Sequence, residues 1–218
     1  MDIRSRIIRN TNNKDNEIII VEGNDGAGKT TYCEYLKKVY KEQNKNYCYF
    51  HFPILGENDY STDVLDKKYI QVLDSNLLNI KDENKKQDLI FDNIEQNSGI
   101  ILNLYNMGYN IIIDRYIISN KVYRLLNNCP DRNNTLPICI VLSYAKLYIK
   151  LRYPNLEHNE NHNHKSIFHW KTDTSKIDKI ILLFNDYVEK YNLNINTLNE
   201  FPDCELEYRL GILGMIQD

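Results

Sequence analysis

The stretch IIIVEGNDGAGKTTYCEYLKK, Ile18 to Lys38, decides the fold of this chain. It opens with a short apolar run bounded by polar residues, which is typical of a buried parallel strand. A glycine-rich turn follows, and beyond it the sequence predicts a helix from about Gly28 to Gln43. Because backbone N–H groups converge at such a turn and at the start of a helix, the stretch predicts a phosphate-binding site.

Within this stretch, Gly23, Gly28, Lys29 and Thr30 complete G-x-x-x-x-G-K-[ST], the P-loop pattern. Lys29 is a point charge that can reach the β- and γ-phosphates of a nucleotide, and Thr30 offers a hydroxyl to Mg²⁺. The match lies between a predicted strand and a predicted helix, so we expect a nucleotide to bind here. The residues expected to contact it are Gly23, Asn24, Asp25, Gly26, Ala27, Gly28, Lys29, Thr30 and Thr31.

Length and composition narrow the class of protein. The 218 residues suit one domain, predicted over 17–218 after a flexible N-terminal tail at 1–16. The net charge of −3 provides no basic field, so neither nucleic acid nor a membrane is expected as a partner. The five cysteines form no C-x-x-C pair, and no apolar run has transmembrane length. We therefore expect reduced thiols and a cytoplasmic location.

Strands and helices alternate along the rest of the chain. The predicted strands are Glu17–Gly23, Tyr47–Phe52, Tyr109–Arg115, Ile138–Ser143 and the edge segment LNINTL, and the later helices are Gln87–Met107, Lys176–Tyr191 and Cys204–Ile216. This order predicts an α/β, P-loop NTPase fold with a central parallel five-stranded sheet flanked by helices. A lid segment is expected at about 146–175. Ligands of such sheets bind beyond the carboxyl ends of the strands.

A second motif, NIIIDRYIISNKVY, runs from Asn110 to Tyr123 and places Asp114 and Arg115 at the tip of a predicted strand. A carboxylate there can hold Mg²⁺ or orient an acceptor phosphate, and an arginine can neutralise charge on a transferred group. Four histidines in the expected lid, His158, His162, His164 and His169, have no cysteine nearby to complete a zinc site. We interpret them as part of a polar lid.

Together the motifs resemble those of the thymidylate kinase family of nucleoside monophosphate kinases. The family carries D-R-[YH]-x-x-S, an F-P pair after the second strand, and an acidic third P-loop residue that hydrogen-bonds the sugar 3′-hydroxyl. Asp114, Arg115, Tyr116 and Ser119 match the first motif, Phe52 and Pro53 match the F-P pair, and Asp25 matches the acidic P-loop residue. The resemblance spans about Glu17 to Tyr123. It implies transfer of the ATP γ-phosphoryl group to dTMP, with Mg²⁺, by a homodimer for which Gln87–Met107 is a candidate face.

The resemblance also implies roles for single residues. Some family members carry a catalytic arginine in the P-loop after the acidic residue, and others supply it from the lid. Gly26 follows Asp25 here, so the arginine is expected from the lid, and Arg152 is our candidate among its basic residues. The implied catalytic residues are Lys29, Asp114, Arg115 and Arg152, the metal ligands are Thr30 and Asp114, and the acceptor contacts are Asp25, Phe52, Pro53, Phe91, Asn93, Arg115, Tyr116, Ser119 and Tyr123.

Four of these contacts have a structural alternative. Asp25 could simply stabilise the loop, and Arg115 could form an ion pair within the sheet edge. Ser119 lies at the start of a predicted helix and could cap it, and Tyr123 could pack in the core.

The chain departs from the family pattern on the acceptor side. Leu55 stands where the F-P-x-R arginine would grip the acceptor phosphate. In the family's F-x-x-N-R segment a phenylalanine stacks on thymine and an arginine bonds its carbonyl. Asn93 aligns with that asparagine, Ile94 takes the place of the arginine, and Phe91 is one residue out of register with the stacking ring. The base-reading contacts are therefore altered.

Two other functions remain open from the sequence. A deoxynucleoside kinase also shows G-N-x-G-x-G-K-T-T, but it needs a carboxylate base after its second strand, where Glu57 is the nearest candidate. A degenerate nucleotide-binding protein would keep the P-loop and lack the acceptor site, as Leu55 and Ile94 suggest.

Overall fold

The computed structural model describes residues 16–62, 66–149, 151, 174–191 and 195–197. Its strands are β1 (Ile18–Glu22), β2 (Tyr47–His51), β3 (Tyr60–Ser61), β4 (Asn110–Asp114), β5 (Ala145–Ile149) and β6 (Ile195–Thr197). Its α-helices are α2 (Lys29–Glu42), α3 (Glu83–Asn106), α4 (Ile117–Leu126), α5 (Leu136–Tyr144) and α6 (Thr174–Tyr191). Three short 3₁₀ helices, η1 (Glu57–Asp59), η2 (Lys67–Tyr69) and η3 (Ser75–Asn79), lie between β2 and α3.

The strands form one sheet in the order β3-β2-β4-β1-β5-β6. All pairings among β2, β4, β1, β5 and β6 are parallel, which confirms the expected five-stranded parallel sheet. The two-residue β3 adds an antiparallel edge to β2. In the register, Val21 and His51 both lie opposite Asp114. The carboxyl ends of the three neighbouring strands β2, β4 and β1 therefore meet at one edge.

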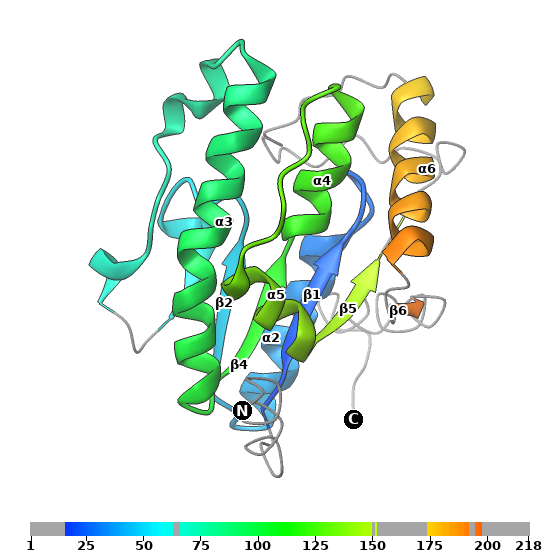
Figure 1. The fold of residues 1–218 in the computed structure, drawn as a ribbon. Coiled ribbons are helices and arrows are strands. Elements are labelled where there is room, and N and C mark those ends of the chain that lie inside the picture. Colours follow the sequence, from blue (N-terminus) through cyan, green and yellow to red (C-terminus); the bar gives the residue numbers. More distant parts are fainter. Residues whose placement is uncertain (1–15, 63–65, 150, 152–173, 192–194, 198–218) are drawn as a thin grey trace, which may run out of the picture.

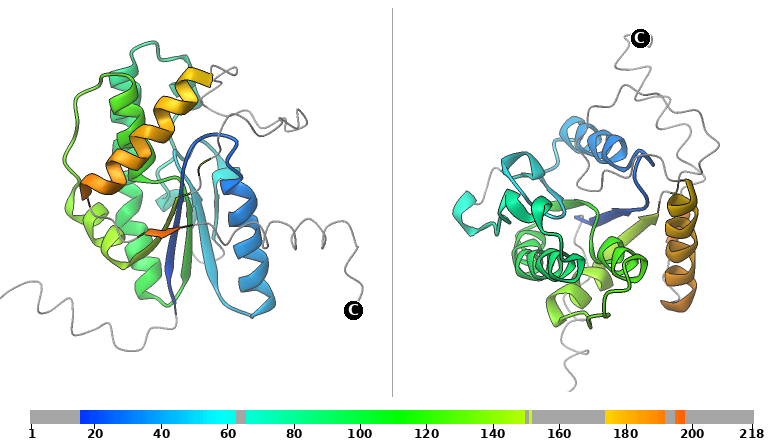
Figure 2. Two further views of the ribbon diagram at one scale, coloured as in Figure 1. Left: turned by 90° about the vertical axis from the view of Figure 1, so that its right-hand side faces the viewer. Right: turned by 90° about the horizontal axis from the view of Figure 1, so that it is seen from above.

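Helices cover both faces of the sheet. Figures 1 and 2 show α2 on one face and α3, α4, α5 and α6 on the other. Successive residues of β1 serve the two layers in turn, as the pleat of a strand requires. Ile19 and Val21 pack in the cluster that includes α2, whereas Ile18 and Ile20 join the larger core beneath α3, α4 and α6. Burial on both faces explains the unbroken apolar run of β1.

The predicted strand at Ile138–Ser143 is wrong, because this segment forms helix α5. Pro137 occupies the first turn of the helix, where a missing N–H costs nothing. Ile138 and Val141, three residues apart, are its buried positions. The strand instead lies at Ala145–Ile149, so Lys146, at the start of the expected lid, pairs in the sheet with Ile19.

Several predicted features lie outside the described residues. These are residues 1–15 of the tail, positions 150 and 152–173 of the expected lid with Arg152 and the four histidines, and the helix predicted at Cys204–Ile216. Among the helices that the structure does describe, none has the length and apolar character needed to cross a bilayer.

Candidate active site

The P-loop joins β1 to α2 as the sequence predicts. Gly26 and Gly28 have φ values of 72° and 78°, in the left-handed region where a side chain would strain the backbone. Gly28 immediately precedes α2, so the helix begins at Lys29 and its free N–H groups face the loop. The loop can therefore surround an anion with backbone donors.

Lys29 is buried, and its Nζ donates a hydrogen bond to the main-chain oxygen of Asn24 across the loop, at 2.6 Å. Burial and the neighbouring charge of Arg115 lower the pKa of Lys29 to about 8, while the carboxylates of Asp114 and Asp25 oppose the shift. The ammonium group of Lys29 is thus held by the P-loop, near one positive side chain, Arg115, and three carboxylates, Asp114, Asp25 and Glu22.

Asp114 ends β4 and is fully buried beside Thr30 of the P-loop. The Thr30 hydroxyl donates to Asp114 Oδ2 at 2.7 Å. The other carboxylate oxygen, Oδ1, has no hydrogen-bond partner among the described residues. A hydroxyl and a partly unsatisfied carboxylate are ligands that suit Mg²⁺, which takes oxygen donors and binds proteins through one or two carboxylates. The two predicted metal ligands are therefore brought together, and they fit the ion.

Arg115 follows directly and has the left-handed φ of 65°, which is uncommon for a residue with a side chain. Its N–H donates to the Val21 carbonyl at 2.9 Å, and its guanidinium forms an ion pair with Asp25 in the P-loop. Burial opposes the charge, but the carboxylates of Asp25, Asp114 and Glu22 raise the pKa of Arg115. The structure thus joins the two sequence motifs directly, through Asp25 and Arg115.

Glu22, the last residue of β1, is a site residue that sequence reasoning missed. It is fully buried and accepts hydrogen bonds from the N–H groups of Tyr116, Ile118 and Ser119, at 2.9, 3.0 and 3.2 Å, and from the Ser119 hydroxyl. Burial raises the pKa of Glu22, although these bonds and the charge of Arg115 oppose the shift. A charged residue ending an otherwise apolar strand was the available signal.

The hydroxyl groups of the D-R-Y-x-x-S element have protein partners. The Ser119 hydroxyl donates to Glu22, so in this structure it serves the start of α4. The Tyr116 hydroxyl lies 2.6 Å from Ser98 Oγ of α3, and the Tyr116 ring packs against Phe52 with 5.8 Å between centroids. Phe52 is itself buried, and its N–H donates to the carbonyl of Asp114. These contacts fix the segment after β2 against the tip of β4.

Tyr123 is buried one turn beyond Ser119. Its pKa is raised, first by burial, with the charge of Asp25 adding to the shift and that of Arg115 opposing it. Tyr123 therefore lies within the electrostatic reach of the Asp25–Arg115 pair.

Two of the expected acceptor contacts on α3 are engaged elsewhere. Asn93 accepts a hydrogen bond from the N–H of Ile54 at 3.0 Å and donates one to the carbonyl of Gln71 at 2.7 Å. These bonds tie the segment between β2 and α3 to α3 at two points. The Phe91 ring is fully buried, and the guanidinium carbon of Arg132 lies 4.1 Å from its centroid. That distance is a cation–π contact.

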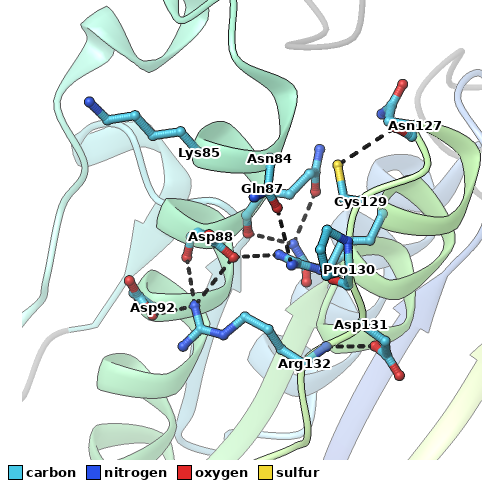
Figure 3. A network of polar contacts seen from close by, with 12 residues as sticks. Asn84, Lys85, Gln87, Asp88, Asp92, Asn127, Cys129, Pro130, Asp131 and Arg132 are labelled. Atoms are coloured by element: carbon cyan, nitrogen blue, oxygen red, sulfur yellow. Dashed lines mark hydrogen bonds and ion pairs between the residues drawn. The ribbon is translucent and has the colours of Figure 1, made fainter.

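Arg132 belongs to a charged network between α3 and the segment after α4 (Figure 3). It donates to Asp92 at 2.8 Å and lies 3.6 Å from Asp88. Arg124, almost fully buried, donates to Asp88 and to the Pro130 carbonyl at 2.8 and 2.7 Å. The network holds the connection from α4 to α5 over the side of α3.

The two departures from the family pattern remain in the structure. Ile94 is 1 % exposed and packs in the main core. Leu55 donates its main-chain N–H to Asp59 and packs beside the same core. Neither position therefore supplies a cation, and Arg152 lies outside the described residues.

The sequence and the fold resemble those of known proteins. The family model for thymidylate kinase matches residues 21–129. Among solved structures, the chain resembles a thymidylate kinase from Candida albicans with 20 % identity, over 84 % of this chain and 82 % of that one, at a TM-score of 0.51. It also aligns with the YorR protein of Bacillus subtilis, solved with phosphorylated GDP, with 17 % identity, coverages of 83 % and 82 %, and a TM-score of 0.44. No curated protein matches the sequence.

Proposed function

The chain belongs to the thymidylate kinase family, and from that premise we propose that it transfers the γ-phosphoryl group of ATP to dTMP. The observation that carries the proposal is the ion pair between Asp25 of the P-loop and Arg115 at the tip of β4. The pair brings the P-loop, whose backbone is suited to donor phosphates, into contact with an arginine suited to an acceptor phosphate, and a phosphotransferase needs such an arrangement.

In the proposed reaction an oxygen of the dTMP phosphate attacks the γ-phosphorus, and the bond from that phosphorus to the β,γ-bridging oxygen breaks, which yields dTDP and ADP. Lys29 neutralises charge on the donor phosphates. Arg115 exchanges its contact with Asp25 for the acceptor phosphate, and Asp25 then becomes available to the sugar hydroxyl. The acceptor is already an anion, so positioning and electrostatics carry the catalysis.

Thr30 and Asp114 would hold Mg²⁺, since the hydroxyl and the carboxylate lie 2.7 Å apart and Asp114 Oδ1 is free of other partners among the described residues. When bound, the ion supplies positive charge to the β- and γ-phosphate oxygens. We also propose the homodimer that the resemblance implies, with α3 as a candidate face; light scattering would then report about twice the chain mass of 25.9 kDa.

A coupled assay that offers dTMP and thymidine separately tests the proposal. ADP release with dTMP and none with thymidine is the expected result. Turnover of thymidine alone would indicate a deoxynucleoside kinase instead. Calorimetric binding of ATP without binding of any deoxynucleotide would indicate a protein that has lost its acceptor site.

A further inference from the structure

Two buried amides join α3 to α4. Asn120 Nδ2 donates to both the main-chain oxygen and the side-chain Oε1 of Gln87, each at 3.0 Å. The remaining polar atoms of the two side chains, Gln87 Nε2 and Asn120 Oδ1, have no hydrogen-bond partner among the described residues. The two residues are 0 % and 3 % exposed. An unpaired buried polar atom costs about 1–3 kcal/mol, so two such atoms on a bonded pair of side chains call for a partner.

The existing bonds fix the polarity of the pair. Turning the Asn120 amide over would place its oxygen against two oxygens of Gln87, and turning the Gln87 amide over would place two N–H donors together. Gln87 therefore presents a free donor, and Asn120 presents a free acceptor. A ligand that satisfies both must offer an acceptor and a donor on one edge.

The pair lies beside the proposed acceptor site. Asn120 directly follows Ser119 and is one turn from Tyr123, which is buried within electrostatic reach of Arg115 and Asp25. On α3, Gln87 shares a face with Ile94, seven residues along, and both are buried. Ile94 occupies the position of the family's base-bonding arginine and has no donor to give.

We propose that Gln87 replaces that absent arginine as the residue that determines base specificity. Its Nε2 donates to a base carbonyl while Asn120 Oδ1 accepts from the neighbouring ring N–H. This inference rests on the proposed function and names its acceptor class: a pyrimidine nucleotide with a carbonyl beside a ring N–H, as in thymine and uracil. Cytosine has the same shape but inverts both groups, so it would set donor against donor and acceptor against acceptor.

The wild-type protein gives the first test. Its kcat/KM for dTMP should exceed that for dCMP by about a hundredfold or more, because rejection of cytosine leaves buried polar groups unpaired. In a thermal-shift measurement without ATP, dTMP should raise the melting temperature and dCMP should not. Equal use of dCMP and dTMP would overturn the inference.

The second test is Gln87→Met, which removes the amide at similar volume and leaves Asn120 bonded to the main-chain oxygen of residue 87. The KM for dTMP should rise about tenfold or more while the KM for ATP stays unchanged, and stability should not fall, since an unpaired buried donor is removed. Asn110→Leu is the matched control. Asn110 is a buried amide at the opposite end of β4 that bonds Glu17 and Asn46, so its loss should lower stability and leave the KM for dTMP unchanged.

A purely structural Gln87 gives the reverse pattern, with lower stability and an unchanged KM for dTMP, and this result would overturn the inference. The two proposals fail differently. A wild-type protein without activity on any nucleoside monophosphate refutes the proposed function. An active protein whose KM for dTMP is the same with and without Gln87 refutes only the base-reading role.

Discussion

At the residue scale, the site depends on charges that are buried next to one another. Lys29, Asp114 and Arg115 are each less than a tenth exposed, and Asp25 pairs with Arg115. Low exposure strengthens every interaction among them and also makes their protonation sensitive to the neighbours. Lys29 and Glu22 therefore lead to predictions about pH and about stability.

The rate with ATP should depend on the protonation of Lys29. Its pKa is lowered to about 8, so kcat/KM for ATP, which reports the free enzyme, should fall as pH rises through about 8.

Stability should move the other way. Between that pKa and the ordinary value of 10.5, the unfolded chain binds more protons, and the free energy of unfolding rises with pH. Initial rates at subsaturating ATP and urea titrations at several pH values check both trends; a flat rate profile across pH 8 would contradict the first.

Glu22→Ala should destabilise the protein by about 2–4 kcal/mol, because the N–H groups of Tyr116, Ile118 and Ser119 lose their shared acceptor. It should also raise the KM for the acceptor. The main chain of Arg115 is held on one side by its own bond to the Val21 carbonyl and on the other by the bond from Tyr116 to Glu22, which the change removes. Glu22→Gln keeps an acceptor and should recover part of both losses. Asp82→Ala removes the cap of α3 and serves as the control, with a cost of about 1 kcal/mol and no change in KM. Denaturant unfolding and steady-state kinetics supply the measurements.

At the scale of elements, local patterns predicted most of the fold. The P-loop and the strands ending at Glu22, His51 and Asp114 follow from apolar runs with clear boundaries. The segment Ile138–Ser143 was wrongly predicted because a short, uniformly apolar run has no period that separates a strand from a helix.

Contacts between distant segments could not be predicted in the same way. Glu22 and Ser119 are 97 residues apart, and the cover of Phe91 by Arg132 depends on how the connection after α4 folds back. A single sequence contains no signal for such pairings.

Two buried amides of α3, Asn93 and Asn97, bond the segment after β2. Asn93→Ala should destabilise the protein by about 1–2 kcal/mol, since the N–H of Ile54 loses its acceptor and the carbonyl of Gln71 keeps only the bond from Asn97. Asn103→Ala, on the exposed side of the same helix, should change stability by less than about 0.5 kcal/mol. Equal effects of the two changes in urea unfolding would contradict this role for Asn93.

At the scale of the whole molecule, parallel order in the sheet creates the site. β4 lies between β2 and β1, so the end of β4 brings Asp114 and Arg115 beside the P-loop and beside the Phe52–Pro53 turn. On the second face Asn120 of α4 bonds Gln87 of α3, and Asn120 directly follows Ser119, whose N–H donates to Glu22 at this edge. Residues from widely separated stretches thus meet at the edge where the proposed donor and acceptor nucleotides would bind.

The most direct measurement follows the phosphoryl group itself. ATP labelled in its γ-phosphoryl group is incubated with Mg²⁺, dTMP and either the wild-type protein or Lys29→Ala, whose fold is checked by circular dichroism. Label is expected in dTDP with the wild type and not with Lys29→Ala. Label that appears only in inorganic phosphate, or in dTDP at the same rate with Lys29→Ala, would contradict the proposed transfer.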